Sequence, residues 1–136
     1  MLVHELRVRY AECDPQGIVF NSRYLEYFDI GLTELWREAL GSYATTMEEH
    51  GVDLVVAEAG IRYRSSLRFD DVFELRVSVA RLGTTAMTTA IEVAREDELI
   101  AEGEMRHVFV ARDGGGKTPI PGHVRDALSP YVREPG

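Results

Sequence analysis

The chain has 136 residues, of which 45% are hydrophobic and 28% are charged, and its formal net charge at pH 7 is −8. This length suits one domain with a substantial core, so we expect a single domain over residues 1–136. The negative charge argues against binding to nucleic acid or to an anionic membrane surface. No run approaches the roughly 18 apolar residues that a membrane-inserted helix needs.

The chain contains one cysteine, Cys13, which cannot form an internal disulfide and therefore fits a reducing compartment. Residues 1–5 lack the basic region and the long apolar segment of a signal peptide. These features predict a cytoplasmic protein. No phosphate-binding glycine loop and no cluster with metal-ligand spacing is found in the sequence, so we expect neither a metal nor a tightly bound cofactor.

The N-terminal third of the chain reads as a strand, a turn and a long helix. Leu2–Tyr10 has strand character, and Asp14–Gly17 has the proline and glycine positions of a tight turn. Between Ser22 and Leu40 apolar residues recur at helical spacing, which predicts one long amphipathic helix. Ser42–His50 predicts a shorter helix that ends at Gly51.

After residue 51 the apolar residues alternate, which is the pattern of strands. We expect strands at residues 52–64, 72–82, 87–93 and 99–111, and a short helix at residues 121–128. Short turns join the later strands, so neighbouring strands should be antiparallel. One face of the last strand is predicted to carry Leu99, Ala101, Gly103, Met105, His107, Phe109 and Ala111.

An apolar sheet face and a single amphipathic helix cover each other most economically when the sheet curls around the helix. The predicted fold class is therefore α+β, with an antiparallel sheet wrapped around one long central helix. So few helices leave a sheet edge or face for a partner, and we expect a homodimer or homotetramer. Tyr27 and Ile30, at the margin of the helix's polar side, are candidates for contacts between subunits.

Asp14 is the first candidate for chemistry. It lies in a turn after a strand, shortly before a helix N-terminus that carries partial positive charge. Aspartate is also common before proline in turns, so the local pattern leaves a structural role open. Cys13 fits a buried filler residue better than a nucleophile, because no histidine is near it in sequence. His107 lies on an apolar strand face and is predicted to be a core histidine with satisfied hydrogen bonds.

Four arginines form a second candidate feature. Arg62, Arg64 and Arg68 gather around one predicted strand end, and Arg81 is placed across a hairpin. Such arginines usually lie on a solvated strand face. Arginine is nevertheless the side chain best shaped to bind phosphate through two parallel hydrogen bonds.

The order of these residues resembles a known signature. Arg9-Tyr10-x-x-Cys13-Asp14-Pro15-x-Gly17-Ile18-Val19-Phe20, followed by Tyr24-Leu25-x-Tyr27-Phe28-Asp29, is similar to hotdog-fold acyl-CoA thioesterases of the 4-hydroxybenzoyl-CoA thioesterase type. That type includes the thioesterase associated with the Tol-Pal system. The resemblance continues through Tyr63, Leu67-x-x-Asp70-Asp71 and Gly83-Thr84-Thr85. The fold of this family agrees with the one that the periodicity predicts.

The resemblance implies hydrolysis of an acyl-CoA thioester, with Asp14 as nucleophile or general base and coenzyme A as part of the substrate. A thioester carbonyl also needs a hydrogen-bond donor for the oxyanion that develops. Family precedent places that donor on a backbone N–H near residues 53–55, usually of the opposite subunit, which makes Leu54 and Val55 substrate-binding candidates. Tyr24 would line the pocket, and Arg62, Arg64, Arg68 and Arg81 include the candidates for binding the coenzyme A phosphates.

Gly31 and Leu32 depart from the family pattern within the long helix.

Three alternatives to acyl-CoA hydrolysis stay open. The enzyme could release acyl groups from acyl carrier protein, or the chain could be a non-catalytic acyl-CoA-binding protein. A hotdog dehydratase is less favoured, because that chemistry needs a histidine paired with an acidic residue and no histidine lies near Asp14 in sequence or within the long helix.

Overall fold

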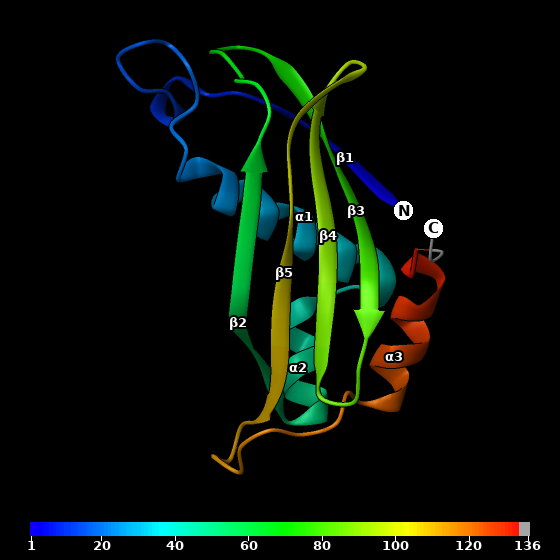
Figure 1. The fold of residues 1–136 in the computed structure, drawn as a ribbon. Coiled ribbons are helices and arrows are strands. Elements are labelled where there is room, and N and C mark those ends of the chain that lie inside the picture. The colour runs from blue at the N-terminus through cyan, green and yellow to red at the C-terminus, as the bar shows by residue number, and fades with distance from the viewer. Residues whose placement is uncertain (134–136) are drawn as a thin grey trace.

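The computed structural model describes residues 1–133 and shows a five-stranded antiparallel sheet that packs against a long helix (Figure 1). The strand order is β1-β3-β4-β5-β2. The strands are β1 (Leu2–Arg7), β2 (Val52–Tyr63), β3 (Val72–Leu82), β4 (Ala86–Arg95) and β5 (Glu98–Ala111). The helices are α1 (Arg23–Leu40), α2 (Tyr43–His50) and α3 (Gly122–Leu128). The predicted α+β arrangement around one central helix is confirmed.

The first strand is shorter than predicted. Leu2–Tyr10 was expected to be extended, but β1 ends at Arg7 and Tyr10–Glu12 form a 3-10 turn. The Val8 N–H still bonds to the Asp71 carbonyl, but the regular pairing of β1 with β3 ends there, because the Val8 carbonyl accepts from the Asp70 N–H and the Asp71 N–H donates to the Arg68 carbonyl. This early exit carries the following loop away from the sheet toward the start of α1.

Helix α1 buries the stripe that its sequence predicts. Tyr24, Phe28, Gly31 and Leu35 recur at helical spacing and are buried, and Leu35 has no exposed surface. Gly31 marks a close approach of α1 to β3, since a Cβ at this position would lie 3.0 Å from Cγ2 of Val77. A glycine at this point therefore lets the helix lie closely against the sheet.

The inner face of the sheet alternates as predicted, with one correction. Phe73, Leu75, Val77 and Val79 of β3 are all buried. In β5 a register shift opposite Val93 and Ala94 inserts one extra residue, so Ile100 points into the core in place of the predicted Leu99. Beyond this bulge, Ala101, Gly103, Met105, His107 and Phe109 are buried as the alternation predicts.

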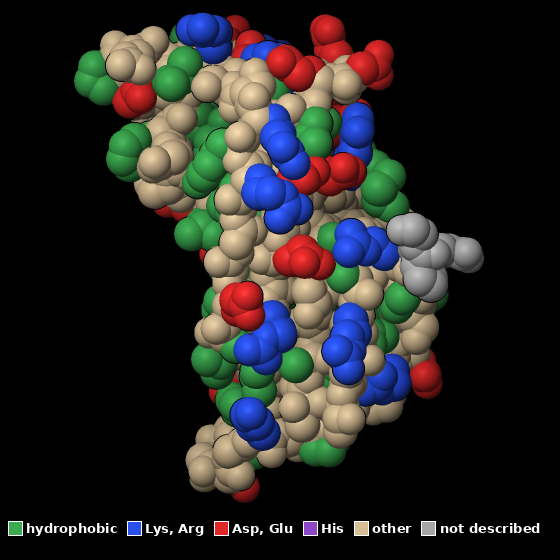
Figure 2. All heavy atoms as spheres, in the orientation of Figure 1, with side chains coloured by type: hydrophobic (Ala, Val, Ile, Leu, Met, Phe, Trp, Pro, Cys, Tyr) green, Lys and Arg blue, Asp and Glu red, His purple; other side chains and the backbone are tan. Residues whose placement is uncertain are grey.

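The outer face of the sheet is polar, and both edges are open. Figure 2 shows arginine and acidic side chains interspersed over the strands on the face away from α1. Strand β2 lies at one edge, where Val55 and Val56 are 50% and 51% exposed. No helix within residues 1–133 is long and apolar enough to cross a membrane.

Gly103 should be indispensable for this packing. A Cβ at residue 103 would lie 2.0 Å from the Gly60 carbonyl oxygen and 3.0 Å from Cε2 of Phe28. We expect Gly103→Ala to lower the free energy of unfolding by about 1–3 kcal/mol or more, because the strands or α1 must move apart. Gly60→Ala is the matched control, since nothing lies within 4 Å of its Cβ position. Chemical denaturation at one protein concentration measures both; equal losses would contradict this account.

Candidate active site

Asp14 sits in a tight turn between the 3-10 turn and α1. Its N–H donates to the Ile18 carbonyl at 2.9 Å, and the Gly17 N–H donates to the Asp14 carbonyl at 2.9 Å. One carboxylate oxygen, Oδ1, accepts a hydrogen bond from the Gln16 N–H at 2.8 Å. The predicted turn is thus confirmed, with Gly17 at φ +81°. Within residues 1–133 the other carboxylate oxygen makes no hydrogen bond and remains available to a substrate.

The Asp14 carboxylate opens into a surface concavity of about 460 Å³, which we call the Asp14 concavity. Its lining residues are Tyr10, Cys13, Asp14, Pro15, Gly17 and Phe69. The Tyr10 and Phe69 rings meet edge to face with centroids 5.8 Å apart, and they are 81% and 53% exposed. The concavity therefore combines an accessible carboxylate with an aromatic wall. Sequence reasoning gave neither Tyr10 nor Phe69 a role, although Tyr10 belongs to the motif and Phe69 lies inside the Leu67-to-Asp71 segment.

Glu12, two residues before Asp14, anchors this turn to α1. It is only 6% exposed, and its carboxylate accepts hydrogen bonds from the Arg9 N–H at 2.8 Å and the Tyr27 hydroxyl at 2.9 Å. Burial, and then the hydrogen bond to Glu12, raises the pKa of Tyr27, so the phenol remains a donor. The sequence alone had left Glu12 without a role.

Tyr27 was predicted to contact another subunit, and this is wrong. Its side chain is 2% exposed and packs against Phe73 with ring centroids 4.8 Å apart. Tyr27 lies directly before Phe28 and three residues after Tyr24, so it shares the buried stripe of α1. Ile30, the other predicted contact, is partly buried and packs against the core.

Tyr24 supports the site from the core rather than lining the Asp14 concavity. It is 2% exposed, and its hydroxyl accepts a hydrogen bond from the Leu67 N–H at 3.3 Å. The Leu67 carbonyl in turn accepts from the Val19 N–H at 2.9 Å. Tyr24 thereby fixes the segment that carries Phe69 beside the turn that carries Asp14.

Cys13 lies in the Asp14 concavity, but its thiol is poorly suited to attack. Burial, together with the nearby Glu12 and Asp14 carboxylates, raises the pKa of Cys13. The reactive form of cysteine is the thiolate, and this environment disfavours it. Asp14 is therefore the better nucleophile or base of the two neighbours.

The four candidate arginines do not form one cluster. Arg62 and Arg64 both bond to Oε1 of Glu102, at 3.2 and 2.9 Å. Arg81 lies at the end of β3, where its backbone is opposite Thr88 of the neighbouring strand β4. Arg68 bridges to Ile18 at the Asp14 turn, and its guanidinium forms no ion pair with any residue of the described chain. Of the four, only Arg68 both adjoins the Asp14 turn and has a guanidinium in no ion pair within residues 1–133, although its backbone N–H donates to Oδ2 of Asp71 at 2.8 Å.

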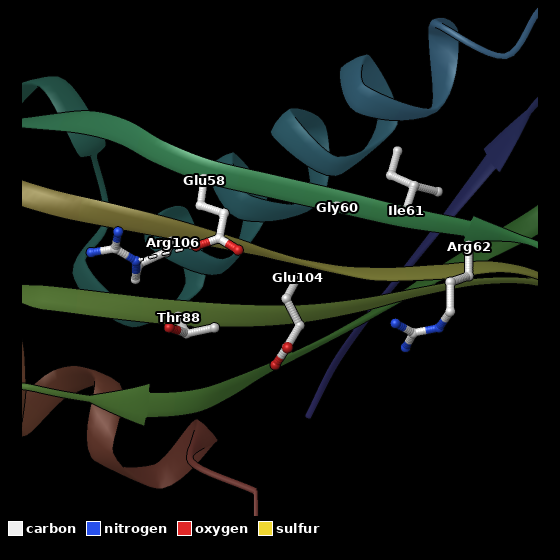
Figure 3. Close-up of a pocket in the computed structure, with 7 residues that line it drawn as sticks. All are labelled: Glu58, Gly60, Ile61, Arg62, Thr88, Glu104 and Arg106. Atoms are coloured by element: carbon white, nitrogen blue, oxygen red, sulfur yellow. Dashed lines mark ion pairs between the residues drawn. The ribbon is translucent and has the colours of Figure 1, made fainter.

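Arg62 also lines a groove of about 400 Å³ on the outer face of the sheet (Figure 3). The groove is formed by Glu58, Gly60, Ile61, Arg62, Thr88, Glu104 and Arg106. Its charges balance, since two arginines face two glutamates, and Arg106 lies 3.9 Å from Glu58. The groove therefore has no net positive charge that would attract a phosphate.

A smaller cavity of about 190 Å³ lies between α1 and the start of β2. Its lining residues are Asp29, Leu32, Thr33, Trp36, Tyr43, Leu54, Val56 and His107. His107 is buried as predicted, and its Nδ1 has no protein hydrogen-bond partner within residues 1–133. Burial lowers the pKa of His107, and Asp29 opposes this shift.

Within one chain, Leu54 lies near the start of β2, whereas the turn that carries Asp14 lies near the end of this strand. The Tyr63 hydroxyl, at the end of β2, donates to the Asn21 carbonyl near the Asp14 turn at 3.0 Å. Leu54 is nine residues earlier in the same strand, which corresponds to about 30 Å at roughly 3.3 Å per residue. Val55 lies beside Leu54 and is half exposed. One chain therefore does not bring Leu54 or Val55 to its own Asp14.

Residues 8–128 match the sequence model of the Thioesterase-like superfamily. The chain therefore belongs to this superfamily, and it is a thioesterase with the hotdog fold. A protein of Aquifex aeolicus is 31% identical over 126 residues, which cover 93% of this chain and 96% of that protein. The acyl-CoA thioesterase YbgC of Haemophilus influenzae is 30% identical over 115 residues, 85% of this chain and 83% of that one. Among solved structures, the hypothetical protein TT1821 of Thermus thermophilus has a TM-score of 0.85 at 34% identity, covering 95% of this chain and 98% of that one.

The contact between Glu12 and Tyr27 should be worth more than a similar bond at the surface. We expect Tyr27→Phe to lower the free energy of unfolding by about 1.5–3 kcal/mol, because a buried carboxylate loses a donor. Tyr131→Phe is the control, since Tyr131 donates to Glu38 at 2.7 Å in an exposed position. That change should cost less than about 0.5 kcal/mol. Denaturant titration compares the two variants, and a Tyr27 loss no larger than the Tyr131 loss would refute the anchoring role.

Proposed function

We propose that this thioesterase hydrolyses acyl-CoA thioesters with Asp14 as the catalytic carboxylate. The observation that carries the proposal is the position of Asp14, which lines an open concavity and whose second carboxylate oxygen makes no hydrogen bond within residues 1–133. Similarity to the acyl-CoA thioesterase YbgC supports coenzyme A as the thiol of the substrate. The reaction needs no cofactor, because coenzyme A enters as part of the substrate, and the expected location is the cytoplasm.

Either of two routes uses the free oxygen of Asp14. As a nucleophile, it bonds to the acyl carbon while the carbon–sulfur bond breaks, and water then hydrolyses the mixed anhydride. As a general base, it accepts a proton from the water that attacks the same carbon. Both routes release a free acid and coenzyme A, and both develop negative charge on the thioester oxygen that a backbone N–H can stabilise.

That N–H donor must come from a second subunit if residues 53–55 supply it, because about 30 Å of strand separates them from Asp14 in one chain. An antiparallel pairing of two β2 edges reverses the strand direction between subunits. A pairing centred between Glu58 and Ala59 would place Leu54 opposite Tyr63 of the partner subunit and Val55 opposite Arg62 of the partner subunit, and so near the partner's Asp14. The dimer, or a tetramer built from it, would then complete two equivalent sites.

Release of an acyl group from acyl carrier protein remains the second candidate, because that substrate presents the same phosphopantetheine thioester. A non-catalytic acyl-CoA-binding protein is less favoured, since binding alone needs no free carboxylate at the thioester. A screen of aromatic, short-chain and long-chain acyl-CoAs, read by free-thiol release, tests the function directly and finds the preferred acyl group. Hydrolysis of acyl carrier protein thioesters but of no acyl-CoA would favour the second candidate.

Asp14→Asn should abolish most of the activity without unfolding the protein. The amide is nearly isosteric but cannot attack carbon or accept a proton, and loss of a general base typically costs about 10²–10⁴-fold. Cys13→Ser is the matched control at the neighbouring position and should remain within a few-fold of wild type. Free-thiol release measures both variants, with circular dichroism as the check on folding. An active Asp14→Asn variant would sink the assignment.

The free edge of β2 should be the interface between subunits. We expect light scattering at micromolar concentration to give the mass of two or four chains. Val56→Lys should shift the protein toward monomers, because it places a charge on a half-exposed edge position. Val3→Lys, at a position 52% exposed on the opposite edge strand, should leave the mass unchanged. A wild-type monomer, or dissociation by Val3→Lys alone, would contradict this interface.

A further inference from the structure

The aromatic wall of the Asp14 concavity is held open to solvent. Tyr10 and Phe69 are far apart in sequence and are among the most exposed large apolar side chains of the described residues. Exposed apolar surface of this kind, gathered beside a functional group, marks a binding surface more often than a chance arrangement. The two rings are therefore placed to contact part of a substrate that reaches Asp14.

The backbone presents Phe69 outward through several fixed contacts. The Phe69 N–H donates to the Gly17 carbonyl at 3.2 Å, which ties it to the turn that carries Asp14. The next residue, Asp70, has φ +71°, in the left-handed region, and the Arg7 guanidinium bonds to its carbonyl at 3.0 Å. Aspartate adopts this conformation more readily than most non-glycine residues, so Asp70 suits the turn that follows Phe69.

The distance requirement of catalysis limits what the wall can touch. The thioester carbonyl must approach the free oxygen of Asp14 to about 3–3.5 Å. Tyr10 and Phe69 line the same concavity, so they would contact groups within a few bonds of that carbonyl. Those groups are the first carbons of the acyl chain on one side and the pantetheine arm on the other. The nucleotide is too far along the substrate to be the group that the rings contact.

The position of Arg68 favours the pantetheine arm over the acyl chain as the group that contacts the two rings. Arg68 directly precedes Phe69 and lies opposite Ile18 of the Asp14 turn. Its backbone N–H donates to Oδ2 of Asp71 at 2.8 Å, but its guanidinium forms no ion pair within residues 1–133. Arg62 and Arg64 are already paired with Glu102, and Arg7 and Arg9 with Asp70 and Glu12. A phosphate held by Arg68 and a carbonyl held at Asp14 would leave the connecting pantetheine arm across the rings of Tyr10 and Phe69.

We propose that Tyr10 and Phe69 form the binding wall for the pantetheine arm of the substrate, between Asp14 and a phosphate contact at Arg68. This inference rests on the proposed function. The arm alternates methylene segments with amides, so its apolar parts pack on ring faces while its amides remain in water. The two rings would therefore select thioesters by their thiol part, whereas the acyl group is selected elsewhere.

The test uses one acyl group on three thiols: coenzyme A, pantetheine without the nucleotide, and ethanethiol without the arm. Phe69→Ala and Tyr10→Ala should each lower kcat/KM by about tenfold on the coenzyme A and pantetheine thioesters, mostly through KM. Both variants should leave the S-ethyl thioester unaffected. Arg68→Gln should lose activity on the coenzyme A thioester alone. Phe69→Tyr should retain wild-type kinetics, which separates a contact of the ring from a disturbed loop.

Phe20→Ala is the matched control, because Phe20 is 51% exposed but does not line the Asp14 concavity. It should change none of the three substrates. Equal losses by Phe69→Ala and Tyr10→Ala on all three thioesters would overturn the proposal. A loss that grows with acyl length, measured with acetyl and octanoyl groups, would assign the rings to the acyl side and overturn it too. If wild type hydrolyses none of the acyl-CoA thioesters, or Asp14→Asn stays active, the proposed function itself fails.

Discussion

The buried contact between Glu12 and Tyr27 is the joint on which the site depends. It links the loop before α1 to the buried face of α1, and Arg9 closes it from the outside through a hydrogen bond and an ion pair at 3.2 Å. A carboxylate this deeply buried is costly unless its oxygens are satisfied, so the donors from Arg9 and Tyr27 must both be in place when the loop is formed. Because Asp14 follows two residues later in a turn with its own hydrogen bonds, the position of the catalytic candidate is fixed by the same packing that seats the helix.

A second constraint is the length of β2. The strand is twelve residues long and lies at a sheet edge, so a backbone N–H at one end cannot reach a thioester carbonyl that is held at the other end. The end near Tyr63 adjoins the Asp14 turn, and the end near Leu54 adjoins the 190 Å³ cavity. Under the proposed function, a fold that divides the carboxylate and the cavity in this way needs a second subunit to complete the site. Pairing of two β2 edges would bring Leu54 of one subunit near Asp14 of the other, and it would also cover the exposed strand. The proposed catalytic mechanism therefore depends on the proposed dimer.

The sequence predicts the fold well because its periodicities reflect burial directly. The stripe of α1 and the alternation of β3 to β5 report which side chains face the core, and each was found in place. The predictions fail at positions where tertiary contacts, rather than the local periodicity, determine the direction of a side chain. Ile100 enters the core through a bulge, and Tyr27 turns inward to meet Glu12. For the site, the motif predicts Asp14 as the catalytic candidate. It could not show that Arg62 and Arg64 share Glu102 while the Arg68 guanidinium forms no ion pair within residues 1–133, because ion pairing across strands depends on register.

The net charge of −8 places a demand on any site for a polyanionic substrate. The overall field of the molecule repels the phosphates, so affinity must come from contacts within about 8 Å, the screening length at physiological salt. Under the proposed function, the negative charge of the substrate also affects Asp14, because the reaction needs Asp14 as an ionised carboxylate. In the proposed arrangement, the pantetheine arm lies between Asp14 and the phosphates, and Arg68 binds a phosphate. This gives the phosphates a local positive contact and keeps their charge away from the Asp14 carboxylate. On this view the pantetheine arm is more than a tether: it keeps the phosphates where arginine can bind them and where their charge does not oppose the carboxylate.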